Sequence, residues 1–156
     1  MQKKILKGFS LIELLLAGAL FSLFAWGIVG VLLSSLDTNR LGEETTIATE
    51  YATEGIEAVR SVASKNFDAV TNIDATGIQR SGGEWELMGA STENTFKKFT
   101  RVIMVETVLR DDAGNISEES GAEDPDTKKV TVTVFYNIAS ARANSIVLTT
   151  YLTRFK

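Results

Sequence analysis

The chain has no cysteine, no histidine and a single proline among its 156 residues. Zinc, haem and iron–sulfur sites therefore lose their usual ligands, thiol catalysis has no nucleophile, and no disulfide can hold a domain together. A Gly-x-Ser-x-Gly motif and a phosphate-binding loop of the Walker type are missing as well. These absences remove the common signatures of an enzyme, and we expect a protein with no catalytic residue and no cofactor.

Positive charge is also scarce, with 16 basic against 20 acidic residues and a net charge of −4. Three of the basic residues, Lys3, Lys4 and Lys7, precede Gly8, so residues 9–156 hold 13 basic and 20 acidic residues, a net charge of −7. Proteins that bind nucleic acid usually present clustered lysine and arginine. The sequence therefore gives no support for a nucleic-acid partner.

What the chain does contain is one long apolar run, from Phe9 to Leu36, with Glu13 as its only charged residue. Leu14–Leu33 is uncharged, and Ser22 is its only polar side chain. As a helix of twenty residues this stretch would span roughly 30 Å, the thickness of the hydrocarbon core of a bilayer. An ionised carboxylate costs about 2.5–3.5 kcal/mol at the centre of such a span and less near its end. We therefore expect Glu13 to have a function.

Two simple interpretations of this run leave Glu13 unexplained. A secretory signal peptide has a basic start, but its apolar region is only about 7–15 residues long and ends at a small-residue cleavage site. A plain transmembrane anchor fits in length, and Lys3, Lys4 and Lys7 would keep the N-terminus in the cytoplasm by the positive-inside rule. The rest of the chain would then lie outside the cytoplasm.

The string Lys7-Gly8-Phe9-Ser10-Leu11-Ile12-Glu13, between a short basic leader and a long apolar helix, resembles the class III signal of type IV prepilins. The resemblance implies that residues 1–8 are a leader peptide, which a prepilin peptidase removes by cutting between Gly8 and Phe9. It also implies that the same class of enzyme N-methylates Phe9. Glu13 would then be the fifth residue of the mature chain, where the family has a glutamate.

For Glu13 the resemblance implies a role in assembly. When the helix leaves lipid and packs among other helices, a buried carboxylate must be paired. The expected partner is the methylated amine of Phe9, on an adjacent subunit or on the same chain. A pair between subunits would fix their axial register, as a buried polar residue does in a coiled coil.

The function that the resemblance implies is that of a minor pilin. Such a structural subunit is stored in the inner (cytoplasmic) membrane as a single-pass protein with its head outside the cytoplasm, and is then assembled into an extracellular type IV pilus or related filament. Its partners would be other pilin subunits through the N-terminal helix, the prepilin peptidase, the inner-membrane assembly platform and, before assembly, membrane lipid. One alternative is a pseudopilin of a type II secretion or DNA-uptake system, in a periplasmic pseudopilus. An alternative of another class is a bitopic, membrane-anchored binding domain that does not polymerise.

Two features depart from the commonest pilin pattern. Proline is frequent at the twenty-second mature residue, where this chain has Gly30, and the disulfide loop common in major pilins is absent. The second departure favours a minor over a major subunit. Further along the chain, the segment Glu54–Ser61 resembles minor pilins and I-type pseudopilins.

The resemblance and the residue pattern together predict an α+β pilin fold, in which a long helix packs on a small antiparallel sheet. The helix would have a hydrophobic part, residues 9–36, and an amphipathic part, residues 37–65. Residues 66–156 would form the head. The buried stripe of the amphipathic part would comprise Ile47, Ala48, Tyr51, Ala52, Ile56, Val59, Val62 and Ala63.

Alternation with a period of two, rich in β-branched residues, predicts three strands in the head, at Phe99–Leu109, Lys128–Ile138 and Asn144–Thr153. The last two would form an antiparallel hairpin with its turn at Ser140–Ala143. Residues 66–98 would be mostly loop, with one short strand near Glu84–Met88. We thus expect a sheet of three or four strands.

Seven acidic residues lie close together between Arg110 and Asp126. Calcium binds several carboxylate oxygens at once, although the spacing of an EF-hand is absent here. The other interpretation is a solvated loop with turns near residues 112–115 and 124–126. The sequence leaves both open, and we assign no metal ligand. The acidic residues are Asp111, Asp112, Glu118, Glu119, Glu123, Asp124 and Asp126.

Overall fold

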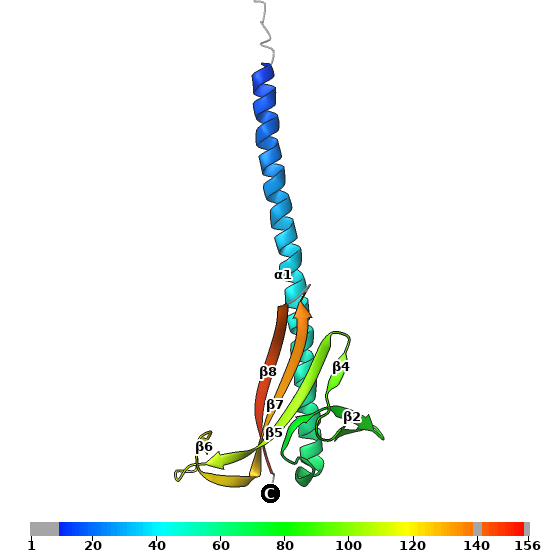
Figure 1. The fold of residues 1–156 in the computed structure, drawn as a ribbon, viewed down its shortest axis with the longest axis vertical. Coiled ribbons are helices and arrows are strands. Elements are labelled where there is room, and N and C mark those ends of the chain that lie inside the picture. The colour runs from blue at the N-terminus through cyan, green and yellow to red at the C-terminus, as the bar shows by residue number, and fades with distance from the viewer. Residues whose placement is uncertain (1–9, 139–141, 155–156) are drawn as a thin grey trace, which may run out of the picture. The chain divides into compact units, whose positions relative to one another are not determined.

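The computed structural model of the chain describes residues 10–138 and 142–154. These residues form one long α-helix, a short 3-10 helix and eight β-strands, so the predicted α+β architecture is confirmed (Figure 1). By its internal contacts the chain divides into two units, one ending at Gly42 and the other beginning at Glu43.

Helix α1, Leu11–Lys65, contains both the apolar and the amphipathic part of the sequence. No proline interrupts it. Glu13 lies in its first turn and Lys65 in its last, and each charge is favourable at that end of the helix dipole. The continuous helix predicted from the sequence is confirmed from Leu11 onward, whereas Phe9 lies outside the described residues.

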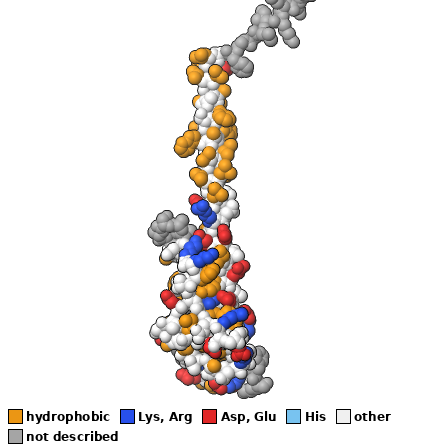
Figure 2. Space-filling model, turned by 90° about the vertical axis from the view of Figure 1, so that its right-hand side faces the viewer, with side chains coloured by type: hydrophobic (Ala, Val, Ile, Leu, Met, Phe, Trp, Pro, Cys, Tyr) orange, Lys and Arg blue, Asp and Glu red, His pale blue; other side chains and the backbone are white. Residues whose placement is uncertain are grey.

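In the unit that ends at Gly42, the large apolar side chains of α1 are exposed. Trp26 is 82% exposed and Leu11 is 77% exposed, and Figure 2 shows hydrophobic side chains along this part of the helix. Among the described residues, α1 is the one helix long and apolar enough to cross a membrane. Apolar surface of this extent marks a region that contacts lipid or another protein.

In the unit that begins at Glu43, an antiparallel sheet packs on the second part of α1. Its main path has the order β1-β5-β7-β8, and two more strands, β4 and β6, pair with β5. Strands β2 and β3 form a separate hairpin. The bounds are η1 Phe67–Ala69, β1 Ile73–Thr76, β2 Ile78–Ser81, β3 Glu84–Leu87, β4 Asn94–Phe96, β5 Phe99–Arg110, β6 Ile116–Ser117, β7 Ala122–Ile138 and β8 Arg142–Thr153.

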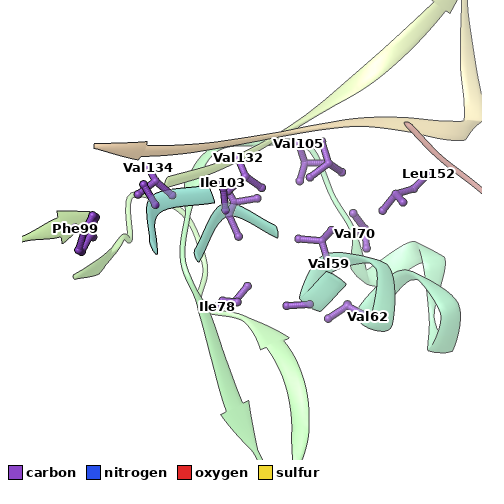
Figure 3. Packing of buried hydrophobic residues seen from close by; sticks show 14 of the residues in the cluster. Val59, Val62, Val70, Ile78, Phe99, Ile103, Val105, Val132, Val134 and Leu152 are labelled. Atoms are coloured by element: carbon purple, nitrogen blue, oxygen red, sulfur yellow. The ribbon is translucent and has the colours of Figure 1, made fainter. Parts of the chain in front are cut away.

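The core of this unit lies between α1 and the inward face of β5, β7 and β8 (Figure 3). The helix approaches the sheet closely at Gly55, where an added Cβ atom would lie 3.0 Å from Cγ1 of Val132 and 3.0 Å from Cδ of Arg101. Gly55 and Ala58 are also buried on this face of α1, in addition to the predicted stripe. The stripe itself is confirmed, since Ala48, Ala52, Val59 and Val62 are buried and Ile47, Tyr51, Ile56 and Ala63 pack against the core.

The three predicted long strands are confirmed as β5, β7 and β8, and β7 pairs with β8 in an antiparallel hairpin. The predicted turn is placed too late, because β8 already begins at Arg142, so that Ala143 belongs to the strand; residues 139–141 lie outside the described residues. Strand β7 begins earlier than predicted, at Ala122.

The prediction for residues 66–98 is wrong in part. Besides β3, this segment forms η1 and the strands β1, β2 and β4. Runs of three or four residues hold too few repeats for their periodicity to be recognised in the sequence. With β1, β4 and β6 included, the sheet has six strands instead of three or four.

Candidate functional site

Glu13 has its carboxylate turned back toward the amino-terminal end of α1. Its Oε2 atom accepts a hydrogen bond from the backbone N–H of Ser10 at 3.2 Å. The N–H of Leu14 in turn donates to the Ser10 carbonyl oxygen at 3.2 Å. The bond from Ser10 to Glu13 is one half of a capping box, in which a glutamate in the first turn satisfies a backbone donor left unpaired by the helix. Glu13 therefore stabilises the start of α1 without any partner from outside the chain.

This orientation determines from which side a cation can approach the Glu13 carboxylate. Ser10 directly follows Phe9 in the sequence, so the carboxylate lies at the peptide nitrogen next to the predicted first mature residue. A carboxylate turned toward the helix N-terminus is well oriented for a cation that approaches from that end. Gly8 and Phe9, the two residues of the predicted cleavage site, lie outside the described residues, and the structure does not place them.

The exposed part of α1 has glycine positions that are open to another helix. Among the described residues, no atom comes within 4 Å of a Cβ added at Gly18, Gly27 or Gly30, apart from the neighbouring backbone of the helix itself. The Ser22 hydroxyl donates to the Gly18 carbonyl at 2.8 Å, so this polar group is satisfied within the helix. Small residues of this kind allow two helix backbones to approach closely in an apolar environment.

Arg101 is a buried charged residue that sequence reasoning missed. Its side chain lies between α1 and the sheet, and the residue is 3% exposed. Its Nη1 atom donates to the backbone oxygen of Tyr51 at 2.9 Å and to Oε2 of Glu54 at 3.0 Å. The guanidinium carbon lies 4.0 Å from the centre of the Tyr51 ring, a cation–π contact. Burial raises the pKa of the Tyr51 hydroxyl, and the charge of Arg101 opposes that shift.

The side-chain amide of Asn94 extends this network to strands β4 and β2. The Nη2 atom of Arg101 donates to Oδ1 of Asn94 at 3.0 Å. Asn94 also accepts from the backbone N–H of Ile78 at 2.8 Å and donates to the Ile78 carbonyl at 2.9 Å. Arg101 thus joins α1, β5, β4 and β2 through one set of hydrogen bonds. The sequence signal was its position in β5, because alternation with Phe99 and Ile103 puts Arg101 on the inward face.

In the acidic segment, the carboxylates of Asp111 and Asp124 accept hydrogen bonds from other groups of the protein. Asp111 accepts from the backbone N–H groups of Ala113 at 3.0 Å and Asn115 at 2.7 Å. Asp124 accepts from Nε of Arg110 at 2.7 Å. The last part of the segment is strand instead of loop, since β7 begins at Ala122. Among residues 10–138 and 142–154, no group of three or more acidic side chains is arranged to hold a metal ion.

These contacts predict a loss of stability in acid. Hydrogen bonds lower the pKa of three carboxyls below the ordinary value of 3.8, from the Asn115 backbone to Asp111, from Thr127 and Arg110 to Asp124, and from Arg154 to Asp68. The folded chain binds these protons less readily than the unfolded chain. The stabilisation is therefore present above pH 3.8 and is lost as the pH falls through the lowered pKa values.

The measurement is denaturant unfolding of the full chain in detergent at stepped pH. The free energy of unfolding should be constant near about pH 6 and fall progressively below about pH 4. The variant Asp111→Asn should flatten part of that fall, because it removes one of the three titrating groups. A free energy that stays constant down to about pH 2 would contradict the prediction.

Comparison of the chain with known protein families, curated proteins and solved structures finds no match. The chain has an α+β fold whose N-terminal helix is long and apolar enough to span a membrane.

Proposed function

We propose that the chain is a minor pilin, a structural subunit made as a prepilin, stored in the inner membrane and assembled into a type IV pilus or related filament. The observation that carries the proposal is Glu13, a carboxylate in the first turn of a helix whose following apolar side chains are exposed. The string from Lys7 to Glu13 supports the same conclusion, because cleavage after Gly8 would make Glu13 the fifth residue.

The mechanism follows from the two environments of α1. Before assembly, lipid covers the exposed side chains from Leu11 to Leu36, and Glu13 lies near the end of the apolar span, where a charge costs less than at the centre. Cleavage before Phe9 creates an amine, and methylation keeps that amine cationic. When α1 enters the filament, neighbouring helices replace the lipid and the Glu13 carboxylate pairs with this amine. Only subunits in the correct axial register complete the pair.

In this mechanism the head remains packed on the amphipathic part of α1. Its sheet packs on the amphipathic part of the helix, and Arg101 ties Tyr51 and Glu54 of α1 to the sheet. The head then supplies whatever surface distinguishes this subunit from its neighbours.

The proposal predicts the chemical state of the native N-terminus. In a host that has an active prepilin peptidase, mass spectrometry should find a chain that begins at methylated Phe9 and lacks residues 1–8. The variant Gly8→Leu places a bulky side chain at the cleavage site and should keep the leader, as a matched control. An intact Met1 in the unsubstituted chain, with the peptidase shown to process another substrate, would contradict the proposal and favour a plain anchor.

Immunolabelling of sheared filaments distinguishes the remaining possibilities. A minor pilin should be found in surface filaments at low copy number. A processed, methylated chain that never leaves the cell envelope would instead favour the pseudopilin, which shares the signal and the helix.

A further inference from the structure

The hairpin turn between β4 and β5 has a lysine in a backbone conformation that favours glycine (Figure 1). Phe96 and Phe99 pair across the two strands, so Lys97 and Lys98 alone form the turn. The favoured hairpin turns of two residues have a positive φ at the first residue, where glycine, asparagine or aspartate is usual. Lys97 has a φ of +56°. A lysine there costs free energy that a glycine would not, which points to a function of its side chain.

The side chains of this turn leave one positive charge and one aromatic ring exposed. Nζ of Lys98 forms an ion pair with Oε1 of Glu44. Nζ of Lys97 lies 5.1 Å from the centre of the Phe96 ring, and among the residues that the structure describes no carboxylate pairs with it. Phe96 is 50% exposed. Exposed lysine next to exposed phenylalanine is typical of surfaces that lie on a membrane.

Contacts within the unit that begins at Glu43 hold this turn against the first residues of that unit. Lys98 pairs with Glu44, and the Phe96 ring lies 6.2 Å from the ring of Tyr51. Glu44 follows Leu36, the end of the apolar run, by eight residues of the same helix, a length of about 12 Å. The headgroup layer on each side of a bilayer is roughly 5–7 Å thick. The turn is therefore tethered close to the headgroups of any membrane that α1 spans.

We infer that the turn formed by Phe96, Lys97 and Lys98 binds the anionic headgroup surface of the membrane in which α1 is stored. The Lys97 ammonium group lies at lipid phosphates, and the Phe96 ring lies among the headgroups. This contact holds the head at the membrane before assembly and breaks when the subunit enters a filament. The inference rests on the membrane storage of α1, which is part of the proposed function, and not on cleavage, methylation or the pairing of Glu13.

The tether is the reason to assign lipid and not a free acidic protein as the partner. One lysine beside an anionic lipid surface favours the bound state only about fivefold. Such a weak contact suffices when α1 keeps the headgroups at a high effective concentration around the turn. A protein that binds from solution would need many more contacts, and the turn offers one unpaired cation and one ring.

The test uses the absence of cysteine from the chain, which allows a single labelled cysteine at a chosen position. The full chain is placed in nanodiscs of neutral phosphatidylcholine, with or without anionic phosphatidylglycerol. An environment-sensitive fluorophore is attached at Thr95→Cys beside the turn, at Ser120→Cys after β6, or at Leu23→Cys in the apolar part of α1. Lipids with a spin label on the headgroup or on the acyl chain quench a fluorophore that lies beside them.

Headgroup quenching of the Thr95 probe gives the ratio of bound to free turn. This ratio should be about fivefold higher in anionic than in neutral nanodiscs, and Lys97→Glu should lower it by at least about fivefold. Lys128→Glu makes the same charge change opposite Thr107, toward the other end of β5, and should leave the ratio unchanged. Lys97→Gly relieves the backbone strain, so it should weaken the contact without lowering the unfolding temperature.

Three outcomes would overturn the inference. The first is quenching of the Thr95 probe that depends neither on lipid charge nor on Lys97, and the second is quenching no stronger than that of the Ser120 probe. The third is a blue shift of the Thr95 probe without headgroup quenching, which identifies a protein contact. Acyl-chain-labelled lipid should quench the Leu23 probe in every nanodisc, so these failures leave membrane storage intact. An unquenched Leu23 probe would refute membrane storage and the inference together.

Discussion

Replacing Glu13 by leucine is expected to leave cleavage and membrane insertion intact and to remove the subunit from filaments. The carboxylate lies in the first turn of α1, after the predicted cleavage site, so leucine extends the apolar surface that lipid covers. In the filament, however, the cationic amine of Phe9 loses its partner. Loss of one member of a buried charge pair costs about 3–5 kcal/mol, which corresponds to a decrease in incorporation of at least about a hundredfold. Immunoblots of sheared filaments and of membranes measure both fractions.

The variant Glu13→Gln separates two roles of the same side chain. Its amide oxygen can still accept the hydrogen bond from the Ser10 N–H, so the start of α1 stays capped. It has no charge to pair with an amine. If the charge pair drives assembly, Glu13→Gln should be excluded from filaments as strongly as Glu13→Leu. Normal incorporation of the leucine variant would refute the assembly role, and normal incorporation of glutamine alone would limit Glu13 to capping.

The long helix and the three long strands could be predicted because each has a pattern that repeats many times. The stripe from Ile47 to Ala63 repeats over more than four turns, and the strands β5, β7 and β8 each alternate over several pairs of residues. A repeated pattern outweighs local exceptions such as Gly55. The structure shows that Gly55 permits close packing of the helix on Val132.

Apart from β3, which was predicted near Glu84–Met88, the short strands could not be predicted, and neither could the buried network, because tertiary contacts determine both. Strand β1 pairs with β5, and β2 with β3, in runs of at most four residues. The partners of Arg101 come from Tyr51 and Glu54 of α1 and from Asn94, 7 to 50 residues away in the sequence. Alternation in β5 places Arg101 on the inward face, but it does not identify the carboxylate and carbonyl that make a buried charge tolerable there.

For the N-terminal site, the sequence supplies most of the hypothesis and the structure supplies the smaller part. The order of residues from Lys7 to Glu13 predicts a cleavage site and a modified amine, and the described residues contain only the last part of that string. The structure adds the orientation of the Glu13 carboxylate, which spacing alone does not give. Sequence and structure therefore contribute different parts of the same hypothesis.

Arg101→Met is expected to destabilise the head by about 2–4 kcal/mol, since methionine fills much of the space but makes none of the charged hydrogen bonds. The cost is below the upper limit for a buried pair because the Glu54 side chain is 47% exposed and can be solvated after the change. In a unit of this size such a loss lowers the unfolding temperature by roughly 10 °C or more. Thermal and denaturant unfolding of the full chain in detergent, followed by circular dichroism, measure it.

Arg60→Met is the matched control for this buried arginine, because Arg60 pairs with Glu57 on the exposed face of α1. An exposed pair of that spacing contributes only about 0.3–0.5 kcal/mol, so the control should lie close to the unsubstituted chain. A double-mutant cycle with Glu54→Gln then isolates the term for Arg101 and Glu54, expected at about 1 kcal/mol for neighbours in one network. Equal effects of Arg101→Met and Arg60→Met would show that the network does not stabilise the packing of α1 on the sheet. A large difference would mean that the buried charge of Arg101 contributes substantially to holding the amphipathic part of α1 on the sheet.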